Sequence, residues 1–489
     1  MRSTFSGFDI ARKALIAQQQ ALNVTGHNIA NAATPGFSRQ RAVLSSSKPY
    51  TIPSMNSPYS AGQVGTGVDV TSIYRLRDEY TDFQLRAENQ TLGDWEAQWE
   101  TLDRVEGIYA EPSSAGLKTT IAEFFNAWQD LSRDAGSDTA RAVVRQRGVA
   151  VTDMFRHIRS QLDDVRTDLN EGIRLALEDI NSLADQISEL NVQIQSSELH
   201  GYMANDLRDK RDLLVDDLSQ LVNISVFDEG GQFAIVVNGN SLVRHDQTTH
   251  MKLSLAEVAP GVHNVVWENK NGTDGSPVGA NSGRLAGLNT ARQKLQDNYI
   301  GALDELANQL AQAVNEIHST GYYLAADADV DDPQPEDWLT GMNFFASTDG
   351  QAISAKNISL IPEMTDTPAG RRLISTVGEN KVTGDGSNAL KLAQLRNQNI
   401  PGLNGTIEQR LEGILGVLGV DAQQAKRIYE NQTMLTEQLQ TRRDSISSVS
   451  LDEEMTDMIR FQHAYNAAAR LVTTMDEVID TLINRTGVR

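Results

Sequence analysis

Two histidines stand close enough in the sequence to raise the question of a metal site. His245 and His250 are five residues apart in the segment HDQTTH. A zinc-binding helix of the metalloprotease type needs two histidines four residues apart, with a glutamate between them. The residues around this pair predict a turn, so we do not expect the pair to bind zinc.

An acidic segment begins like a calcium-binding loop. Asp327, Asp329 and Asp331 supply a D-x-D-x-D start. The sixth position is Asp332 where glycine is needed, and the twelfth is Trp338 where a bidentate glutamate is needed. The sequence therefore favours a solvated acidic loop, and weak adventitious calcium binding is the alternative.

A third acidic group, Asp452 to Glu454, could be interpreted as a pair of catalytic carboxylates. These residues precede a long helical pattern, where negative side chains interact favourably with the helix dipole. The sequence has no nucleophile elbow, phosphate-binding loop or ordered Ser/His/Asp set. We therefore expect no catalytic residue, no metal and no cofactor, and we predict that the protein is not an enzyme.

The charge balance excludes further classes of function. The 489 residues include 65 Asp and Glu against 43 Lys and Arg, a formal net charge of −22. Nucleic acids and anionic lipids both bind cationic surfaces, so neither is an expected partner. There is no cysteine, and Asp9, Arg12 and Lys13 interrupt any apolar signal segment at the N-terminus. If the chain leaves the cell, we expect no cleaved signal peptide.

The first segment predicts a helix with an apolar column repeating every seven residues. The column consists of Phe8, Leu15, Leu22 and Ile29. Such a heptad pattern is typical of helices that pair in a coiled coil. Thr34-Pro35-Gly36 is expected to end the helix, because proline disfavours helix in the residue before it and glycine accepts a tight turn.

The last segment, about 451–484, has a similar pattern. Its apolar residues follow one another at spacings of three and four. They are Phe461, Tyr465, Ala468, Val472, Met475, Ile479 and Leu482. Apolar stripes of this kind often belong to an intramolecular core. The alternative is packing between subunits, and the position of the stripes at the two ends of the chain favours it.

Between the ends the hydrophobic period changes twice. Residues 158–194 carry apolar side chains at helical spacing and predict a long rod, and Asn205-Asp206 is expected to cap a further helix. Residues 222–270 have a period of two, which predicts a small β subdomain. A helix is expected over 284–318, and helices resume near residue 389.

These patterns predict a mainly α fold with a small β subdomain. The N- and C-terminal helices are expected to form a coiled-coil-like pair, followed by a long helical rod domain and a small mixed insertion. The predicted domains are 1–40 with 446–489 (terminal), 41–321 with 384–445 (rod) and 322–383 (outer insertion).

Three stretches resemble a known family. NIANAATPGFSRQ, residues 28–40, is similar to the N-terminal signature of flagellar rod, hook and hook-associated proteins. Residues 450–485 resemble the C-terminal signature of that family. NDLRDKRDLLVDDLSQLVNISV, residues 205–226, is similar to the helical domain of its hook–filament junction members.

The resemblance implies a structural subunit of the bacterial flagellum at the junction of hook and filament. It implies export from the cytoplasm by the flagellar type III system, so that the protein is extracellular, and self-assembly into a ring. It also implies three partners, which are the flagellar hook protein, hook-associated protein 3 and an export chaperone that binds the C-terminal helix.

The resemblance assigns functional residues to both ends of the chain. The expected assembly interface is the apolar column of the first helix together with Phe461, Tyr465, Val472, Met475, Ile479 and Leu482, and the last helix would also bind the chaperone. The expected motif turn consists of Asn31, Thr34, Pro35, Gly36 and Phe37. The alternatives are a distal rod or hook subunit, and, from other classes of protein, an enzyme or an adhesin carried on the flagellum.

Overall fold

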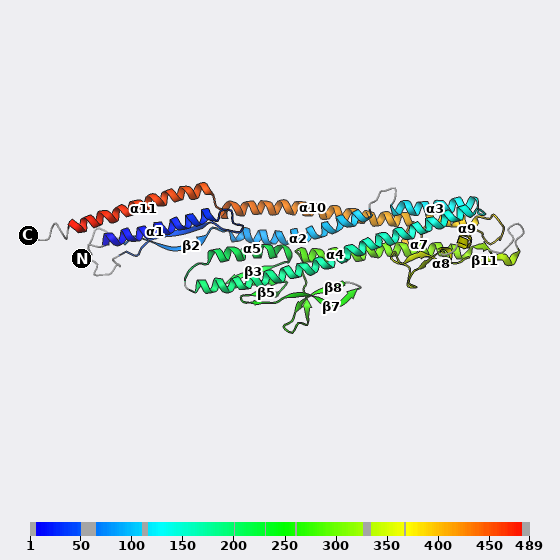
Figure 1. The fold of residues 1–489 in the computed structure, drawn as a ribbon, viewed down its shortest axis with the longest axis horizontal. Helices are drawn as coiled ribbons and strands as arrows, with labels where there is room; N and C mark the ends of the chain where they lie inside the picture. Colours follow the sequence, from blue (N-terminus) through cyan, green and yellow to red (C-terminus); the bar gives the residue numbers. More distant parts are fainter. Residues whose placement is uncertain are drawn as a thin grey trace, which may run out of the picture.

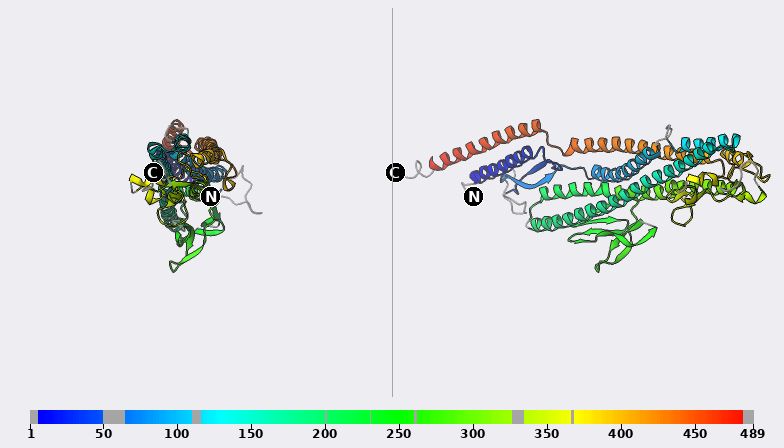
Figure 2. Two further views of the ribbon diagram at one scale, coloured as in Figure 1. Left: turned by 90° about the vertical axis from the view of Figure 1, so that its right-hand side faces the viewer. Right: turned by 45° about the vertical axis from the view of Figure 1, so that its right-hand side comes forward.

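The computed structural model describes residues 6–49, 65–109, 116–199, 201–229, 231–259, 262–325, 334–365 and 368–481. These residues form an elongated, slender molecule in which long helices run along the main axis (Figures 1 and 2). Small sheets lie against one side of the helices. No described helix is long and apolar enough to cross a membrane.

The two ends of the chain form one unit, which we call the terminal unit. Its helices are antiparallel, because Asn28 near the end of the first contacts Glu454 near the start of the last, and Gly7 lies against Met475. Figure 1 shows this pair at one end of the molecule, beside a two-stranded antiparallel sheet. The elements are α1 (Ser6–Ala30), β1 (Gln40–Ser46), β2 (Val68–Arg75) and α11 (Leu451–Asp480).

The rod is built from long helices that bury an apolar stripe. Along α4, Ile158, Leu162, Ile173, Ile180 and Ile187 recur at helical spacing and are at most 3% exposed. With 61 residues, α4 is about 90 Å long at the usual rise per residue. The rod helices are α2 (Glu79–Tyr109), α3 (Leu117–Arg133), α4 (Asp138–Glu198), α5 (Asn205–Leu221), α6 (Arg284–Lys294), α7 (Gly301–Thr320), α9 (Ser387–Gln394) and α10 (Ile407–Ser447).

Small residues allow these helices to approach closely. A Cβ atom at Gly287 of α6 would overlap the backbone oxygen of Asp94 in α2. A Cβ at Gly93 would overlap the backbone oxygen of Gln220 in α5. The crossing of α2 with α5 and α6 therefore requires glycine at both positions.

The β subdomain consists of two antiparallel sheets, ordered β3-β4-β5-β6 and β7-β8-β9, that dock on α4. Asn181 of α4 donates to the backbone oxygen of Met251 (2.8 Å) and accepts from its backbone nitrogen (2.9 Å). Asn191 donates to the backbone oxygen of His245. The strands are β3 (Ser225–Glu229), β4 (Gln232–Val237), β5 (Asn240–Arg244), β6 (Gln247–Thr248), β7 (Met251–Ala259), β8 (Val262–Glu268) and β9 (Asp274–Pro277).

The described part of the insertion shares the core of the rod at the end far from the termini. Phe344 is fully buried, and its ring contacts those of Phe124, Trp128, His318 and Phe345 at centroid distances of 4.9–5.7 Å. The elements are β10 (Tyr322–Leu324), β11 (Trp338–Thr340), β12 (Phe345–Ser347), β13 (Ile358–Leu360) and the short helix α8 (Pro362–Thr365). Short 3₁₀ turns connect them, η2 (Pro335–Asp337) and η3 (Pro368–Leu373), and two more lie near α9, η4 (Leu395–Asn397) and η5 (Pro401–Leu403).

A buried histidine of α7, His318, connects this helix to the insertion through hydrogen bonds. The Nδ1 atom of His318 lies 2.5 Å from the backbone oxygen of Met342, and its Nε2 accepts from the backbone nitrogen of Ser375 at 3.0 Å. Since Nε2 accepts, Nδ1 carries the proton and the ring is neutral. Burial lowers the pKa of His318 to about 4, and the nearby charge of Arg141 acts in the same direction.

We expect this histidine to make the stability of the protein depend on pH. The unfolded chain takes up a proton near the ordinary pKa, whereas the folded chain does not until about pH 4. Acidification from pH 7 to pH 5 should therefore lower the free energy of unfolding by about 2 kcal/mol through this group alone. Urea unfolding at both pH values checks this, with His318→Gln as the variant that should lose this part of the dependence. An unchanged dependence in that variant would contradict the assignment.

This architecture confirms the predicted fold class, but some local predictions were wrong. Asn205 does not cap α5 with its side chain, which instead donates to the side chain of Gln40 and the backbone of Ile73. The helix expected over 284–318 is interrupted by a π-helical turn, η1 (Leu295–Ile300), between α6 and α7. The proposed division into domains stays a prediction.

Candidate functional site at the joint

The three stretches that carry the family resemblance come together at one place, the joint between the terminal unit and the rod. Arg39 reaches from the first stretch to Glu453 and Glu454 at the start of α11, at 2.6 Å to each. The backbone nitrogen of Ser38 donates to Asp209 of α5 at 2.9 Å. Segments more than 400 positions apart in the sequence are thereby connected.

A buried asparagine organises the first stretch. Asn28 is 1% exposed. Its amide nitrogen donates to the backbone oxygen of Gln40 (2.9 Å) and to Glu454 (3.0 Å), and its oxygen accepts from the backbone nitrogen of Gln40. All three hydrogen bonds are buried, and breaking one would leave a polar group unpaired away from water. They therefore fix the end of α1, the start of β1 and the start of α11 relative to one another.

The motif turn lies on the rod side of the joint. Asn31 bonds back to the oxygen of His27 and accepts from Thr34, and Phe37 packs edge-on against the ring of His27. Gly36 has a φ of +74°, and a Cβ there would lie 3.1 Å from the side chain of Leu213. Glycine is needed at this position for both reasons. Pro35 is exposed.

Below the turn lies a set of paired charges, the joint cluster. All of its side chains are at most 16% exposed. Asp212 of α5 is central, with oxygens 2.8 Å from Arg75, 2.9 Å from Arg77 and 3.6 Å from Arg86. The joint cluster consists of Arg75, Arg77, Asp82, Arg86, Asp209, Asp212, Asp216 and Arg443.

Two members of the joint cluster, Asp212 and Arg77, are held in the ionised form by their neighbours. Burial raises the pKa of Asp212, but the charges of Arg77, Arg75 and Arg86 lower it further than burial raises it, so the pKa lies below its ordinary value. For Arg77, burial lowers the pKa, and the nearby carboxylates of Asp212 and Asp82 raise it above the ordinary value. This cluster was not predicted from the sequence. A signal was present, since Asp209, Asp212 and Asp216 follow helical spacing on one face of α5.

The predicted column of α1 is not the stripe that α1 buries within the chain. Phe8 is 37% exposed, and Leu15, Leu22 and Ile29 are partly buried. The residues that α1 buries are small or polar, namely Ala11, Ala17, Ala21, Thr25 and Asn28. Apolar side chains of α1 therefore remain accessible at the edge of the helix pair.

The predicted stripe of α11 behaves differently. Phe461, Tyr465, Val472, Met475 and Ile479 are all partly buried, and Met475 lies against Gly7 of α1. Leu482 lies outside the described residues. This stripe shares the helical face of Ala468, which α11 buries.

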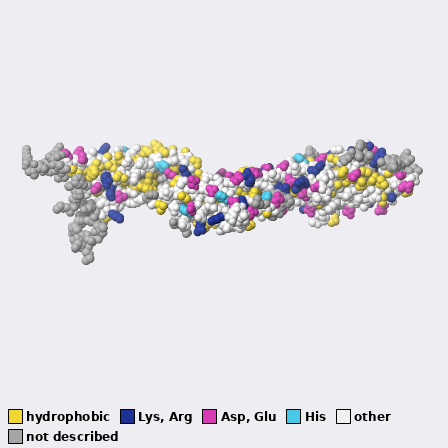
Figure 3. Space-filling model, turned by 60° about the horizontal axis from the view of Figure 1, so that its bottom comes forward, with side chains coloured by type: hydrophobic (Ala, Val, Ile, Leu, Met, Phe, Trp, Pro, Cys, Tyr) yellow, Lys and Arg dark blue, Asp and Glu magenta, His cyan; other side chains and the backbone are white. Residues whose placement is uncertain are grey.

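A second apolar stripe on α11 faces solvent. Leu451, Met455 and Ile459 are 51–57% exposed and stand four residues apart. On the face shown in Figure 3, hydrophobic side chains gather over the end that carries the terminal unit, whereas charged side chains are spread along the middle of the rod. An exposed apolar patch of this kind is typical of an interaction surface.

The described histidines and glutamates that were considered for chemistry each contact another side chain. His245 contacts Gln195, whereas His250 pairs with Asp185, so the two histidines bind different turns of α4. Glu453 and Glu454 are engaged by Arg39. Asp327, Asp329 and Asp331 lie outside the described residues. Within the described part of the chain, no group of three His, Asp or Glu side chains is arranged to hold a metal ion.

Family models match the chain at both ends and in the middle. A model of the helical domain of flagellar hook-associated protein FlgK matches residues 102–331. A model of the C-terminal part of flagellar basal body rod FlgEFG proteins matches residues 441–485, and one of flagella basal body rod proteins matches residues 8–37.

Similar proteins extend over the whole chain. Flagellar hook-associated protein 1 of Bacillus subtilis is 34% identical, with 100% of this chain and 99% of that protein covered. The protein of the same name from Salmonella typhimurium is 26% identical, with 97% and 98% covered. The solved structure of the flagellar hook junction protein FlgK from Burkholderia pseudomallei has the same fold, with a TM-score of 0.60 at 17% identity over 75% of this chain and 100% of that one.

A paired terminal unit joined through a polar joint to a helical rod, with rod-protein models matching both ends, defines an axial protein of the bacterial flagellum. The sequence identity to the Bacillus subtilis protein over the full length of the chain defines the family more narrowly. The chain belongs to the flagellar hook-associated protein 1 family and is a structural component of the flagellum. This confirms the expectation of a hook–filament junction protein that the resemblance provided.

Proposed function

We propose that this chain assembles with copies of itself into a ring that joins the flagellar hook to the filament, through its terminal unit. The observation that supports the proposal is the solvent-facing stripe of Leu451, Met455 and Ile459, on a helix whose other apolar stripe is partly covered by α1. Covering such a surface with a second apolar surface lowers the free energy by about 25 cal/mol for each Å² of apolar area removed from water.

The partners in this proposal are the flagellar hook protein on one side of the ring and hook-associated protein 3 on the other. An export chaperone binds the C-terminal helix before assembly, because that helix exposes apolar side chains in the single chain. The protein is exported from the cytoplasm and acts outside the cell. Its role is mechanical rather than catalytic.

Substitution of Ile459 by Asp tests the proposal. The side chain is 54% exposed in the single chain, so its replacement should leave the melting temperature within about 2 °C. In the ring it would bury a carboxylate in an apolar contact, which costs several kcal/mol in each subunit. We expect cells with this variant to lose attached filaments and motility. Leu15 and Ile479 are less suitable, because both are partly buried within the chain already.

Two controls define the result. Thr474→Asp changes an exposed polar residue of α11 outside the stripe and should leave motility unchanged. Ile180→Asp places a carboxylate in the fully buried stripe of α4 and should lower the melting temperature of the purified monomer. Normal filaments in cells that carry Ile459→Asp would contradict the proposed role of this stripe.

A further inference from the structure

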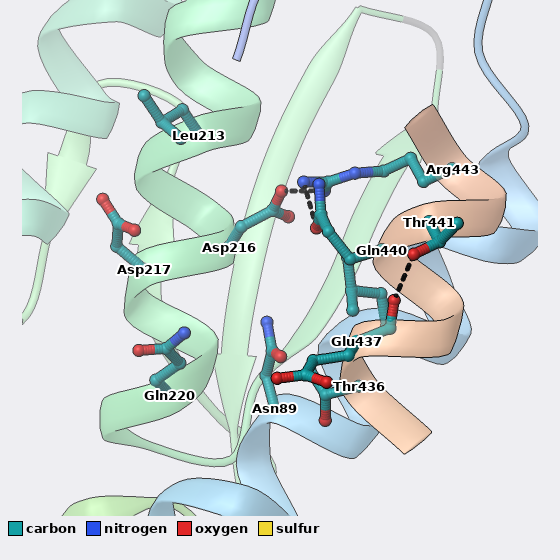
Figure 4. A pocket seen from close by; sticks show the side chains of 11 residues that line it. Asn89, Leu213, Asp216, Asp217, Gln220, Thr436, Glu437, Gln440, Thr441 and Arg443 are labelled. Carbon is teal, nitrogen blue, oxygen red and sulfur yellow. Dashed lines mark hydrogen bonds and ion pairs between the residues drawn. The ribbon is translucent and has the colours of Figure 1, made fainter. Parts of the chain in front are cut away.

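A groove opens at the joint between α5, α2 and α10. Its volume is about 530 Å³, and a smaller hollow of about 190 Å³ adjoins it and reaches the motif turn at Gly36. Figure 4 shows the side chains of the larger groove, with Asp216, Asp217 and Gln220 on one wall and Glu437, Gln440 and Arg443 on the other.

The groove has no free cation among its described lining residues. Its single basic side chain, Arg443, is held by Asp216 at 2.5 Å and by Gln440 at 2.7 Å. Asp217 and Glu437 also line the groove, and neither carboxylate forms an ion pair with a described residue. Partial desolvation and the neighbouring charge of Asp216 raise the pKa of Asp217, although its side chain is exposed.

The side-chain amide of Asn89 independently indicates that a hydrogen-bond donor is missing from the groove. Asn89 is 5% exposed and lies between the two walls in Figure 4. Its nitrogen donates to Ser219, but its buried oxygen has no hydrogen-bond partner among the described residues. A buried acceptor without a donor is unfavourable, so a donor that reached it would be bound favourably.

We propose that the groove receives a lysine or arginine side chain from a second copy of this chain, and that this contact locks neighbouring copies at the joint. A cationic head satisfies acceptors only, and its aliphatic stem can lie along Leu85 and Leu213, which also line the groove. This inference rests on the proposed self-assembly. When two copies pack side by side in the same orientation, a residue of one copy lies near residues of the other that have the same position along the long axis of the rod.

Basic side chains are available at that level. Arg41 on β1 and Lys210 on α5 are both exposed, and neither forms an ion pair within the described part of the chain. Arg41 follows Gln40, whose side chain contacts Asp206 of α5, and Lys210 lies one residue from Asp209 in the joint cluster. Either residue of one copy therefore lies close to the level of the groove in the next.

Charge reversal tests the contact, because in a self-assembly every copy carries both sides of it. Asp217→Lys is expected to reduce the fraction of cells with attached filaments at least tenfold, with little change in the melting temperature, since Asp217 is exposed. Adding Lys210→Glu or Arg41→Glu to the same chain should restore the filaments in one of the two combinations. Restoration in neither would overturn the proposal.

Two further variants separate this contact from ordinary effects on stability. Asn89→Leu removes the unpartnered amide, so the monomer should be as stable as before or more stable while assembly falls. Glu430→Lys is the matched control, since Glu430 is exposed on α10 seven residues before Glu437, outside the larger groove, and should assemble normally. Unimpaired assembly of the Asn89 variant would also count against the groove.

The outcome is distinguishable from a failure of the proposed function. If Ile459→Asp abolishes assembly while the groove variants assemble normally, only the groove contact is wrong. Because the chain has no cysteine, a Gln220→Cys variant carries one unique thiol, and a thiol-reactive cross-linker can identify the occupant of the groove in isolated flagella. A cross-link only to a different flagellar protein would overturn the assignment to a second copy.

Discussion

An Asp212→Ala variant should lose about 3 kcal/mol of unfolding free energy, because removal of one partner leaves buried cations incompletely paired. Asp212 contacts Arg75, Arg77 and Arg86 together. We expect the lower end of the range known for buried pairs, because each arginine keeps a second carboxylate of the joint cluster. Urea unfolding followed by circular dichroism measures the change.

The matched control is Asp168→Ala. Asp168 also pairs with an arginine, Arg104, but both side chains are more than half exposed. Water screens such a pair, so the loss should stay below about 1 kcal/mol. Equal losses in the two variants would show that burial does not set the strength of the joint cluster.

The same carboxylate should contribute to acid sensitivity. Because the pKa of Asp212 is lowered in the folded chain, its contribution is present above the ordinary aspartate pKa near 4 and is lost as the pH falls below it. This window lies below that of His318, so the two contributions can be separated in a titration of stability.

Phe344→Ala is expected to cost about 3–5 kcal/mol, the usual range for removing a buried aromatic ring. Phe344 is fully buried, and one edge of its ring lies against Gly148 of α4. Its loss would leave a cavity among Phe124, Trp128 and Phe345 that rigid helices on both sides cannot close. The midpoint of urea unfolding should fall accordingly.

Phe227→Ala provides the comparison for this variant. Phe227 lies on β3 and is 52% exposed, so its removal should change the free energy of unfolding by less than about 0.5 kcal/mol. If Phe344→Ala were equally mild, the insertion would not share a cooperative core with the rod.

Hydrophobic period was enough to predict the long helices and the β subdomain, because burial repeats locally in both. Along α4, every apolar position from Ile158 to Ile194 that was used in the prediction lies in a helix, and most of these side chains are buried. The break at Leu295 could not be predicted in this way, since a π-helical turn changes the hydrogen bonds without interrupting the apolar pattern.

The candidate site was less predictable, because it depends on which distant segments meet. The heptad columns predicted two helices that pair, but not that α1 would bury alanines while Phe8 stays accessible. Asn205 has the residue type of a helix cap, yet tertiary contacts to Gln40 and Ile73 take its amide. Arg75 and Arg77 alternate along an extended segment and so share one face, but their partners on α5, Asp209 and Asp212, lie more than 130 residues away.

The joining of the first and last helices through Asn28 and Glu454 also sets an order of events. These two residues are 426 positions apart, so nearly the whole chain must emerge before their contact can form. A chain delivered from its N-terminus, by a ribosome or through a narrow conduit, therefore keeps α1 without its partner until the end. The rod also needs a distant contact, that of α2 with α10, but α10 emerges before α11 does. Completion of the terminal unit thus reports that the chain has emerged through α11, and a copy truncated before α11 would carry a finished rod without a finished end.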